Sequence, residues 1–509
     1  MKKRMISLFR SALFLTIVAI CVSGQQSAPI RPQFAATSNA APTPSSGQFD
    51  KIWSVALSEF NQSNQWGASV TQLTNGRLVA GGADGGNQPN SCRGFFGGAW
   101  LIAVTPSGGK VFQKLYSDCA TAEQWANFVR STADGGFILS GEDNSTPFCQ
   151  PCAWLAKLTS SGTIVWQEDL TSFLGSGVNL KPTSDGGYIT TGFGQLNETG
   201  PISGLIMKLS ETGAAQWSEL STETAQSFPG AVVNDSGGLS FNSIVPTPDG
   251  GYALSGVADA RFSSGFAHVL VLMKITSAGN VQWSRAYYSS TWGSYVPGES
   301  LQYPVFPTPD GSYTVSGTVQ TLRYPYQTMF FLMHIDSQGN ILWQKRYGGA
   351  DGYFNHANAI SASPTSDGGF ILAGYSDIFL QEFDGWLVKT DDQGNIQWQN
   401  LYFGTEPIGS NEVILNDIIQ TADGGYAAAG VSYVGSLSYG GPGFLILKTD
   451  ARGKVGTCTS CSQATHTSVQ ALDLQAYDAV FDQTNPALVF TATNMNAKKT
   501  SVTPISLFP

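Results

Sequence analysis

The side chains best suited to chemistry in this chain are its cysteines, because a thiol can form a disulfide or bind a soft metal ion. An even number of cysteines in an exported protein predicts disulfides. Among three possible connectivities for the first four, we expect Cys92–Cys119 and Cys149–Cys152, while Cys458–Cys461 closes a small loop. The six cysteines downstream of residue 24 are Cys92, Cys119, Cys149, Cys152, Cys458 and Cys461.

A four-thiolate zinc site is the alternative for the first four cysteines, since Cys149 and Cys152 have the Cys-x-x-Cys spacing of zinc ligands. Only one such pair is present among them, and an oxidising compartment favours the disulfide. Neither Cys-x-x-Cys pair is followed by histidine, which excludes covalent haem attachment. We therefore predict no metal and no cofactor.

The other reactive side chains form no catalytic pattern that the sequence reveals. The four histidines, at 268, 334, 356 and 466, are too scattered to indicate a metal cluster or a triad. The chain has no Gly-x-Ser-x-Gly elbow and no phosphate-binding loop. A glycosidase or lyase stays open as an alternative, because two carboxylates in a central funnel leave no sequence signature.

An aspartate recurs at the start of a tight Asp-Gly turn. A calcium site is one interpretation, but the chain lacks an Asp-x-Asn/Asp-x-Asn/Asp-Gly loop. In such a turn the carboxylate accepts hydrogen bonds from nearby backbone N–H groups, so we interpret these residues as structural. They are Asp134, Asp185, Asp249, Asp310, Asp367 and Asp423, preceded by a degenerate copy at Asn75-Gly76.

These turns belong to a repeat of about 50 to 65 residues. The second half of the repeat is an apolar run that ends in Lys, followed by a second Gly turn and then a Trp, as from Lys389 to Trp398. Gly accepts the positive φ of such turns, so each unit contains two hairpins and four strands. In the sixth unit we expect strands at 359–364, 370–375, 385–390 and 396–402. The seven units predict an all-β fold, a seven-bladed β-propeller of four-stranded antiparallel blades over residues 49–461.

The ends of the repeat predict how the ring closes. The seventh unit contains the apolar run at 444–448 but no Trp strand after its turn. Residues 52–57 have the form of a Trp strand, similar to 281–286, yet no hairpin precedes them. We expect this N-terminal strand to complete the last blade, since that placement removes an unpaired sheet edge.

The repeat resembles the Asp-Gly-Gly-Tyr propeller repeats of secreted and cell-surface proteins of bacteria and archaea, most of them without assigned activity. The resemblance covers nearly all of residues 50 to 458. The Trp half is also similar to the repeat of pyrroloquinoline quinone dehydrogenases, and Thr-x-Asp-Gly-Gly to the Asp-box turn of sialidases. Both likenesses concern packing and turns, so they imply fold and not activity. The eight blades and adjacent cysteines of the dehydrogenases, and the three arginines of sialidases, are not found.

The N-terminus predicts export. Three basic residues precede an apolar stretch from 12 to 22 that ends in small residues, so 1–24 is predicted to be a signal peptide. Lipidation of Cys21 is disfavoured because Ile20 is too large for the residue before it. Residues 25–48 are a flexible linker rich in Ser, Ala and Pro. The mature protein is then secreted, whether periplasmic, extracellular or at the cell surface.

Charge and hydropathy narrow the partners. The net charge of −10 disfavours nucleic acid, which demands a basic surface. No other apolar run approaches the roughly 20 residues of a membrane span, so we expect no membrane span. We also expect the protein to be a monomer. The Thr-, Ala-, Val- and Asn-rich tail, 462–509, has strand-like pieces at 479–481 and 488–492. It either lies along the propeller, extends toward a surface attachment, or is loosely ordered.

The variable loops are the predicted binding surface. Within each unit the first-to-second and third-to-fourth connections are tight, whereas the other connections vary and fall at the opposite end of the ring. Aromatics there either form a platform for a glycan or protein ligand or simply pack the loops. The candidates are Trp125, Trp292, Tyr295, Tyr324, Tyr326, Tyr353, His356, Phe383 and Tyr439.

The function that the sequence favours is a secreted, non-catalytic binding or scaffold module. The alternative is a propeller enzyme with carboxylates in the central funnel, either a glycosidase or lyase or, less favoured, a quinone-type dehydrogenase.

Overall fold

The chain divides into two compact units, Met1–Phe49 with Pro297–Glu299, and Asp50–Val296 with Ser300–Pro509. Every residue described by the computed structural model belongs to the second unit, so the predicted signal peptide and linker lie outside the described residues. The described residues are 53–57, 65–84, 98–117, 124–143, 152–171, 174–197, 199–224, 227–228, 231–232, 238–262, 265–294, 303–322, 326–348, 356–377, 383–403, 412–433, 442–456, 462–465, 468–484, 490–492 and 496–499.

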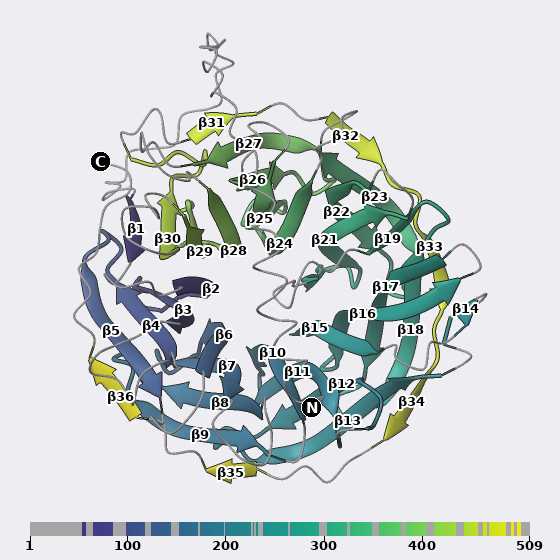
Figure 1. Cartoon of the computed structure of the whole chain (residues 1–509), viewed down its shortest axis with the longest axis horizontal. Helices are drawn as coiled ribbons and strands as arrows, with labels where there is room; N and C mark the ends of the chain where they lie inside the picture. The colour runs from purple at the N-terminus through teal and green to yellow at the C-terminus, as the bar shows by residue number, and fades with distance from the viewer. Residues whose placement is uncertain are drawn as a thin grey trace, which may run out of the picture. The chain divides into compact units, whose positions relative to one another are not determined.

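The described residues form strands and turns, arranged as seven antiparallel blades around one axis (Figure 1). The chain runs outward within each blade, so that the first strand of each blade surrounds the axis and the last lies at the rim. This arrangement confirms the predicted seven-bladed β-propeller.

The first three blades each contain four strands of the repeat. The first has β2 (Gln65–Gln72), β3 (Leu78–Asp84), β4 (Gly98–Val104) and β5 (Lys110–Ser117). The second has β6 (Gln124–Ser131), β7 (Phe137–Asp143), β8 (Cys152–Leu158) and β9 (Ile164–Leu170). The third has β10 (Leu174–Pro182), β11 (Tyr188–Gln195), β12 (Ser203–Leu209) and β13 (Ala215–Glu223).

The fourth and fifth blades carry extra short strands. The fourth has β15 (Leu239–Pro246), β16 (Tyr252–Phe262), β17 (Gly265–Ile275) and β18 (Val281–Tyr288), with β14 (Ala231–Val232) paired to β16. The fifth has β20 (Val305–Pro307), β21 (Tyr313–Thr321), β22 (Thr328–Ile335) and β23 (Ile341–Gly348). Between them, β19 (Trp292–Ser294) pairs with both β17 and β21 and joins the two blades into one sheet.

The last two blades complete the ring. The sixth has β24 (Ala357–Pro364), β25 (Phe370–Ser376), β26 (Asp384–Thr390) and β27 (Ile396–Tyr402). The seventh has β28 (Val413–Gln420), β29 (Tyr426–Ser432), β30 (Gly443–Thr449) and, at its rim, β1 (Trp53–Leu57).

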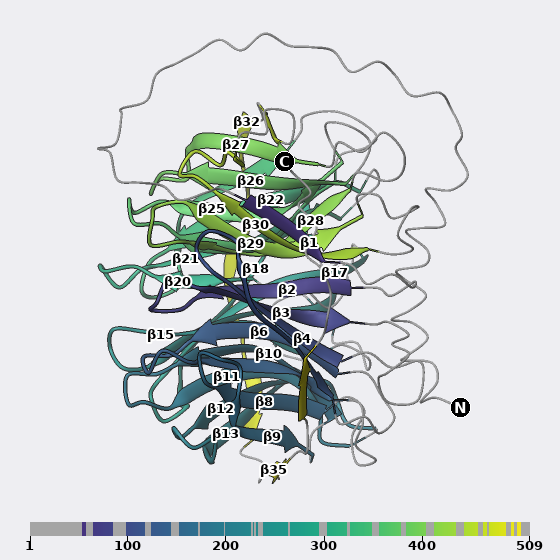
Figure 2. The ribbon, with the colours of Figure 1, turned by 90° about the vertical axis from the view of Figure 1, so that its left-hand side faces the viewer.

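The N-terminal strand closes the ring as predicted. Strand β1 runs antiparallel to β30 with a continuous register from Trp53 opposite Lys448 to Leu57 opposite Phe444. Figure 2 shows purple β1 beside the green strands of the seventh blade. The first and last strands of the ring therefore share one sheet. Strand β30 is paired on both sides, by β29 and β1, so its edge is not exposed.

The tight turns gather at one end of the ring, which we call the turn end, and the variable connections at the other, the loop end. At the turn end the Gly-Gly pair has two separate roles. Gly135 has a φ of 81°, a conformation that other residues rarely adopt. A Cβ on the next residue, Gly136, would lie 2.3 Å from the carbonyl oxygen of Leu158, so only glycine fits there.

Five of the six turn aspartates are also bound to the Lys of the repeat. In the third blade the Asp185 carboxylate accepts hydrogen bonds from the Gly187 backbone N–H and the Thr183 hydroxyl. The Lys208 Nζ lies 2.8 Å from Asp185 Oδ2, and the Lys208 side chain is almost completely buried. The same pair recurs as Lys157–Asp134, Lys274–Asp249, Lys389–Asp367 and Lys448–Asp423. These contacts support the structural interpretation of the repeated aspartates.

Neighbouring blades are joined by the aromatic residues of their rim strands. Trp217 packs against Tyr252 of the next blade, with ring centroids 6.3 Å apart. The buried Tyr402 donates a hydrogen bond of 2.6 Å to the Gly453 carbonyl in the following blade. Equivalent tyrosine bonds reach Gly162, Gly339 and Gly394 from Tyr116, Tyr287 and Tyr347. The Trp and Tyr series is therefore packing between blades.

The C-terminal tail lies along the propeller, the first of the three alternatives that the sequence left open. Its strands add a fifth antiparallel strand to six blades in reverse order, from the sixth back to the first, and appear yellow at the rim in Figure 1. We call them the C-terminal belt. They are β31 (Ser462–Ala464) on β27, β32 (Ser468–Ala471) on β23, β33 (Gln475–Asp478) on β18, β34 (Phe481–Thr484) on β13, β35 (Phe490–Ala492) on β9 and β36 (Asn496–Lys499) on β5.

The belt is anchored by apolar side chains as well as by strand pairing. Leu472 and Leu474 are buried in the core around the fifth blade. Phe481 packs edge-on against Phe228, and the ring of Tyr477 stacks on that of Tyr288 at 4.4 Å. Burying a large apolar side chain contributes about 2 kcal/mol, so the belt stabilises the rim that it covers.

A chain that ends at residue 461 is expected to lose stability and to self-associate, because six rim strands would expose unpaired backbone groups. Light scattering coupled to size exclusion measures the association, and thermal unfolding measures the midpoint. The matched control is a chain that ends at Lys499, which keeps the belt. A monomeric 461-residue chain with an unchanged midpoint would contradict this role.

Acid is expected to weaken the turn end. Hydrogen bonds from Lys208 and Thr183 lower the pKa of Asp185 to about 2, below its ordinary 3.8. Because the folded-state pKa is depressed, the pair stabilises the fold fully above pH 4, and this stabilisation is lost as the pH falls through 2. Asp185→Asn should cost about 0.5 kcal/mol at pH 7 and clearly less at pH 2. Urea denaturation at both pH values tests this, and an equal loss at pH 2 argues against it.

Candidate functional site

Five of the nine predicted ligand-binding residues lie among the described residues. They are Trp125, Trp292, Tyr326, His356 and Phe383. The other four, Tyr295, Tyr324, Tyr353 and Tyr439, lie outside them. The described five all stand at or next to strand ends on the loop end of the ring, but they do not form one group.

Four of the five gather at the fifth and sixth blades. Thr328, two residues after Tyr326, forms a parallel bridge with His356, so these two segments lie side by side. Trp292 stands opposite Thr321 in the pairing of β19 with β21. Phe383 immediately precedes β26 and packs edge-on against Tyr375, with centroids 5.1 Å apart. Trp125 lies apart from them, on the inner strand β6 of the second blade.

These side chains differ in their exposure to solvent: Tyr326 is exposed, whereas Trp292 is buried. Tyr326 is 54% exposed and so presents its ring to solvent. Trp292 is 6% exposed, and the Arg346 guanidinium lies 4.4 Å from its ring centroid. Trp292 is therefore packed within the protein, whereas more than half of the Tyr326 side chain is accessible to solvent.

His356 adds a polar group beside Tyr326. Its Nδ1 lies 3.0 Å from Asp377 Oδ2, and its backbone N–H donates to Asp377 Oδ1 at 2.8 Å. The bond to Asp377 raises the pKa of His356 above its ordinary value. With its side chain 40% exposed, His356 is a solvent-facing group with a fixed ring orientation.

Cys152, at the start of β8, is in a disulfide bond. The other predicted disulfide cysteines, Cys92, Cys119, Cys149, Cys458 and Cys461, lie outside the described residues, so their pairing stays a prediction.

A cluster of acidic residues at the third and fourth blades was not predicted. Glu223 ends β13, and its Oε1 accepts the backbone N–H of Asp259 on β16 at 3.1 Å. The Asp259 carboxylate in turn lies 2.6 Å from Nδ1 of His268 on β17. Burial and the Asp259 carboxylate raise the pKa of Glu223 to about 7. A carboxyl group that titrates near neutrality beside a His–Asp pair has the properties of a general acid or base.

The axis of the ring carries a second cluster that the sequence did not indicate. The seven strands around the axis contain three charged residues, Arg130 on β6, Lys181 on β10 and Asp417 on β28. We call these three the axial charges.

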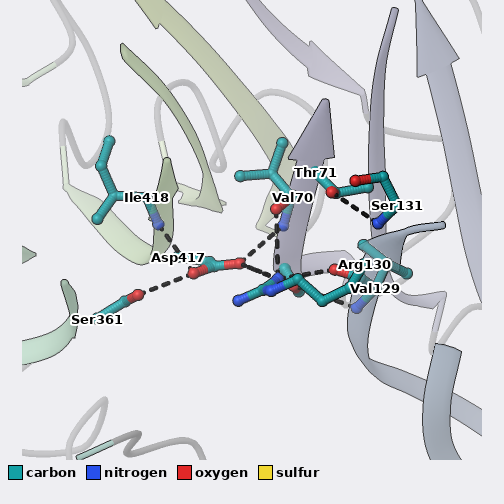
Figure 3. A network of polar contacts seen from close by, with 9 residues as sticks. Val70, Thr71, Val129, Arg130, Ser131, Ser361, Asp417 and Ile418 are labelled. Atoms are coloured by element: carbon teal, nitrogen blue, oxygen red, sulfur yellow. Dashed lines mark hydrogen bonds and ion pairs between the residues drawn. The ribbon is translucent and has the colours of Figure 1, made fainter. Parts of the chain in front are cut away.

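Asp417 is completely buried and binds three other blades (Figure 3). Its Oδ2 accepts hydrogen bonds from the Ser69 hydroxyl at 2.7 Å and the Val70 backbone N–H at 3.0 Å, and lies 3.1 Å from Arg130 Nη1. Its Oδ1 accepts the Ser361 hydroxyl at 2.8 Å. Burial alone would raise the pKa of Asp417, but the Arg130 guanidinium and these hydrogen bonds hold it below its ordinary value.

Sequence reasoning missed both clusters for the same reason. Their residues come from different blades and have no fixed spacing along the chain. One signal was present for the axis: each axial charge lies shortly before an Asp-Gly or equivalent turn, at a position where the other repeats have uncharged residues.

No group of three or more His, Cys, Asp or Glu side chains in the described ranges is placed to hold a metal ion. In the same part of the chain, no helix is long and apolar enough to cross a membrane.

No protein-family model matches the sequence, and no curated protein matches it. Among solved structures, the chain is similar to the crystal structure of a protein of unknown function from Dyadobacter fermentans DSM 18053. That likeness has a TM-score of 0.42 at 10% identity and covers 78% of this chain and 99% of that chain.

Asp417→Asn is expected to destabilise the fold by about 3 kcal/mol, because it leaves the mostly buried Arg130 guanidinium without its counter-charge. Urea denaturation measures the loss. Ser361→Ala, which removes one neutral donor to the same carboxylate, should cost about 1 kcal/mol. Equal losses in the two variants would show that the charge of Asp417 does not matter to the ring.

Proposed function

We propose that this chain is a secreted, non-catalytic binding or scaffold propeller that holds a glycan or a protein ligand at its loop end. The observation that carries the proposal is the difference between the two ends of the ring: contacts near the turn end repeat from blade to blade, and connections at the loop end vary. The repeated contacts all lie in the turn-end half: the Asp–Lys pairs join strands of one blade, and the Trp–Tyr and Tyr–Gly contacts join neighbouring blades. Among the described residues of the loop end no contact recurs in this way from blade to blade, and the connections there differ in length.

The chemistry at the fifth and sixth blades suits a ligand with both apolar and polar faces. The exposed ring of Tyr326 offers a flat surface, and the neighbouring His356 offers a polar nitrogen held in place by Asp377. Sugars and peptide side chains both present this combination to aromatic platforms.

An acid–base enzyme is the second candidate, and Glu223 is the observation that favours it. A carboxyl group with a pKa of about 7 is suited to proton transfer at neutral pH. The cluster lies at the outer strand of the third blade and not at the axis, where Asp417 is the one carboxylate of the seven inner strands. The enzyme that this site would support therefore differs from one with paired carboxylates in a central funnel.

A glycan array probed with the mature protein tests the first candidate. Tyr326→Ala should weaken binding at least tenfold without changing the unfolding midpoint, because the ring is exposed. Leu342→Ala is the matched control, since Leu342 lies in the same blade and is 57% exposed. It should leave binding unchanged.

The outcomes separate the candidates. Binding that is lost with Tyr326 and occurs without turnover supports the non-catalytic module. Cleavage of an arrayed glycan that disappears in Glu223→Gln while binding persists identifies an enzyme. Binding that survives Tyr326→Ala unchanged overturns the proposed surface.

A further inference from the structure

The axial charges have a sign opposite to that of the protein. The whole chain has a net charge of −10, yet the strands around the axis contribute two cations and one carboxylate. Asp417 is already bound by Arg130 and by two serines. One positive charge, that of Lys181, is left without a counter-ion in the described residues.

The two cations occupy the same place in adjacent blades. Arg130 stands opposite Ile138 and Lys181 opposite Ile189, in each case one step before the end of the inner strand. In the other five blades this position holds Thr71, Val245, Phe306, Ser363 and Ile419. The cations therefore lie at one level on one side of the axis, next to the turn end.

A shared aromatic ring holds both cations. The Arg130 guanidinium carbon lies 3.6 Å from the centroid of the buried Phe128 ring, and Lys181 Nζ lies 5.3 Å from the same centroid. Cation–π contact with this ring stabilises the two side chains in place. Phe128 thus holds in place two positive groups that repel each other.

Both cations keep donors for a further partner. Among the described residues, no hydrogen bond or ion pair involves Lys181 Nζ, and the side chain is half-buried. The contacts of Arg130 with Ser69, Asp417 and the Val129 carbonyl all use Nη1. None of the hydrogen bonds in the described ranges uses its Nε or Nη2.

We propose that Lys181 and Arg130 form a binding site for an oxyanion, the carboxylate, sulfate or phosphate group of a ligand, at the axis next to the turn end. An oxyanion matches the unused guanidinium donors and the unpaired ammonium together. This site lies at the opposite end of the ring from the loop-end surface, so it goes beyond the proposed function and stands or falls separately.

The neighbours of Lys181 predict how binding depends on pH. The charged groups that act on it are Arg130 on β6 and Asp417 on β28. Burial and the Arg130 guanidinium lower the pKa of Lys181 to about 7, against the opposing effect of Asp417. Lys181 is then charged at pH 6 and neutral at pH 9, so the site should bind an anion at the lower pH and release it at the higher.

Isothermal titration calorimetry of the mature protein with sulfate tests the site, because sulfate keeps its charge between pH 6 and pH 9. The affinity of the wild type should fall at least tenfold between these values at constant ionic strength. Lys181→Met should lose at least tenfold at pH 6, and Lys181→Arg should bind equally at both pH values. Lys454→Met, an exposed lysine of a turn, is the matched control and should behave as wild type.

Further arms identify the source of the anion. Inorganic phosphate, acetate and glucuronate at pH 6 compare a free ion with a carboxylate carried by a sugar, and tighter binding of glucuronate than of acetate points to an acidic saccharide. Thermal unfolding of each variant confirms that it is folded. Lys181→Met should unfold no lower than wild type. The change removes a positive charge that Arg130 repels, leaves an apolar side chain beside Phe128, and breaks no hydrogen bond found among the described residues. Sulfate binding that is equal in wild type and Lys181→Met, or that persists undiminished at pH 9 in the wild type, overturns the proposal.

Discussion

Closure of the ring is the constraint on which the rest of this structure depends. A propeller blade is stable only when both faces are covered by neighbours and its outer strand does not invite another chain. Strand β1 meets β30 at the rim of the seventh blade. Asp417 of the same blade reaches Ser69, Val70 and Arg130 near the axis. The last blade is therefore tied to the start of the chain at the rim and to the first two blades at the axis.

The same requirement separates the two ends of the molecule. Contacts that recur from blade to blade, such as Lys208 with Asp185 or Tyr402 with the Gly453 carbonyl, use the short turns, because the same turn recurs in each repeat. Connections at the loop end differ in length from blade to blade, as the strand bounds show. The residues around the axis follow neither the repeated contacts of the turn end nor the variable loops. Two blades have Arg130 and Lys181 at a position that is uncharged in the other five.

The fold was predictable from sequence because its information is local and repeated. Strands expected at 370–375 and 396–402 are found at Phe370–Ser376 and Ile396–Tyr402. The belt was predicted only in part: strand-like pieces at 479–481 and 488–492 overlap β34 and β35. The sequence did not decide among three paths for the tail, because strands of three or four residues take their register from the rims that they pair with. The clusters around Asp417 and Glu223 escaped prediction because each joins residues from separate blades, and no spacing along the chain reports such a meeting.

The reverse path of the C-terminal belt gives the molecule a mechanical polarity. Tension applied at Lys499 meets the pairing with β5 first and that with β27 last. The belt strands would separate from the rim strands one after another, so that only a few residue pairs resist the force at a time. The N-terminal strand would respond otherwise, since pulling along its direction shears the whole β1–β30 register at once. The C-terminal belt is thus expected to detach at a lower force than the N-terminal strand β1.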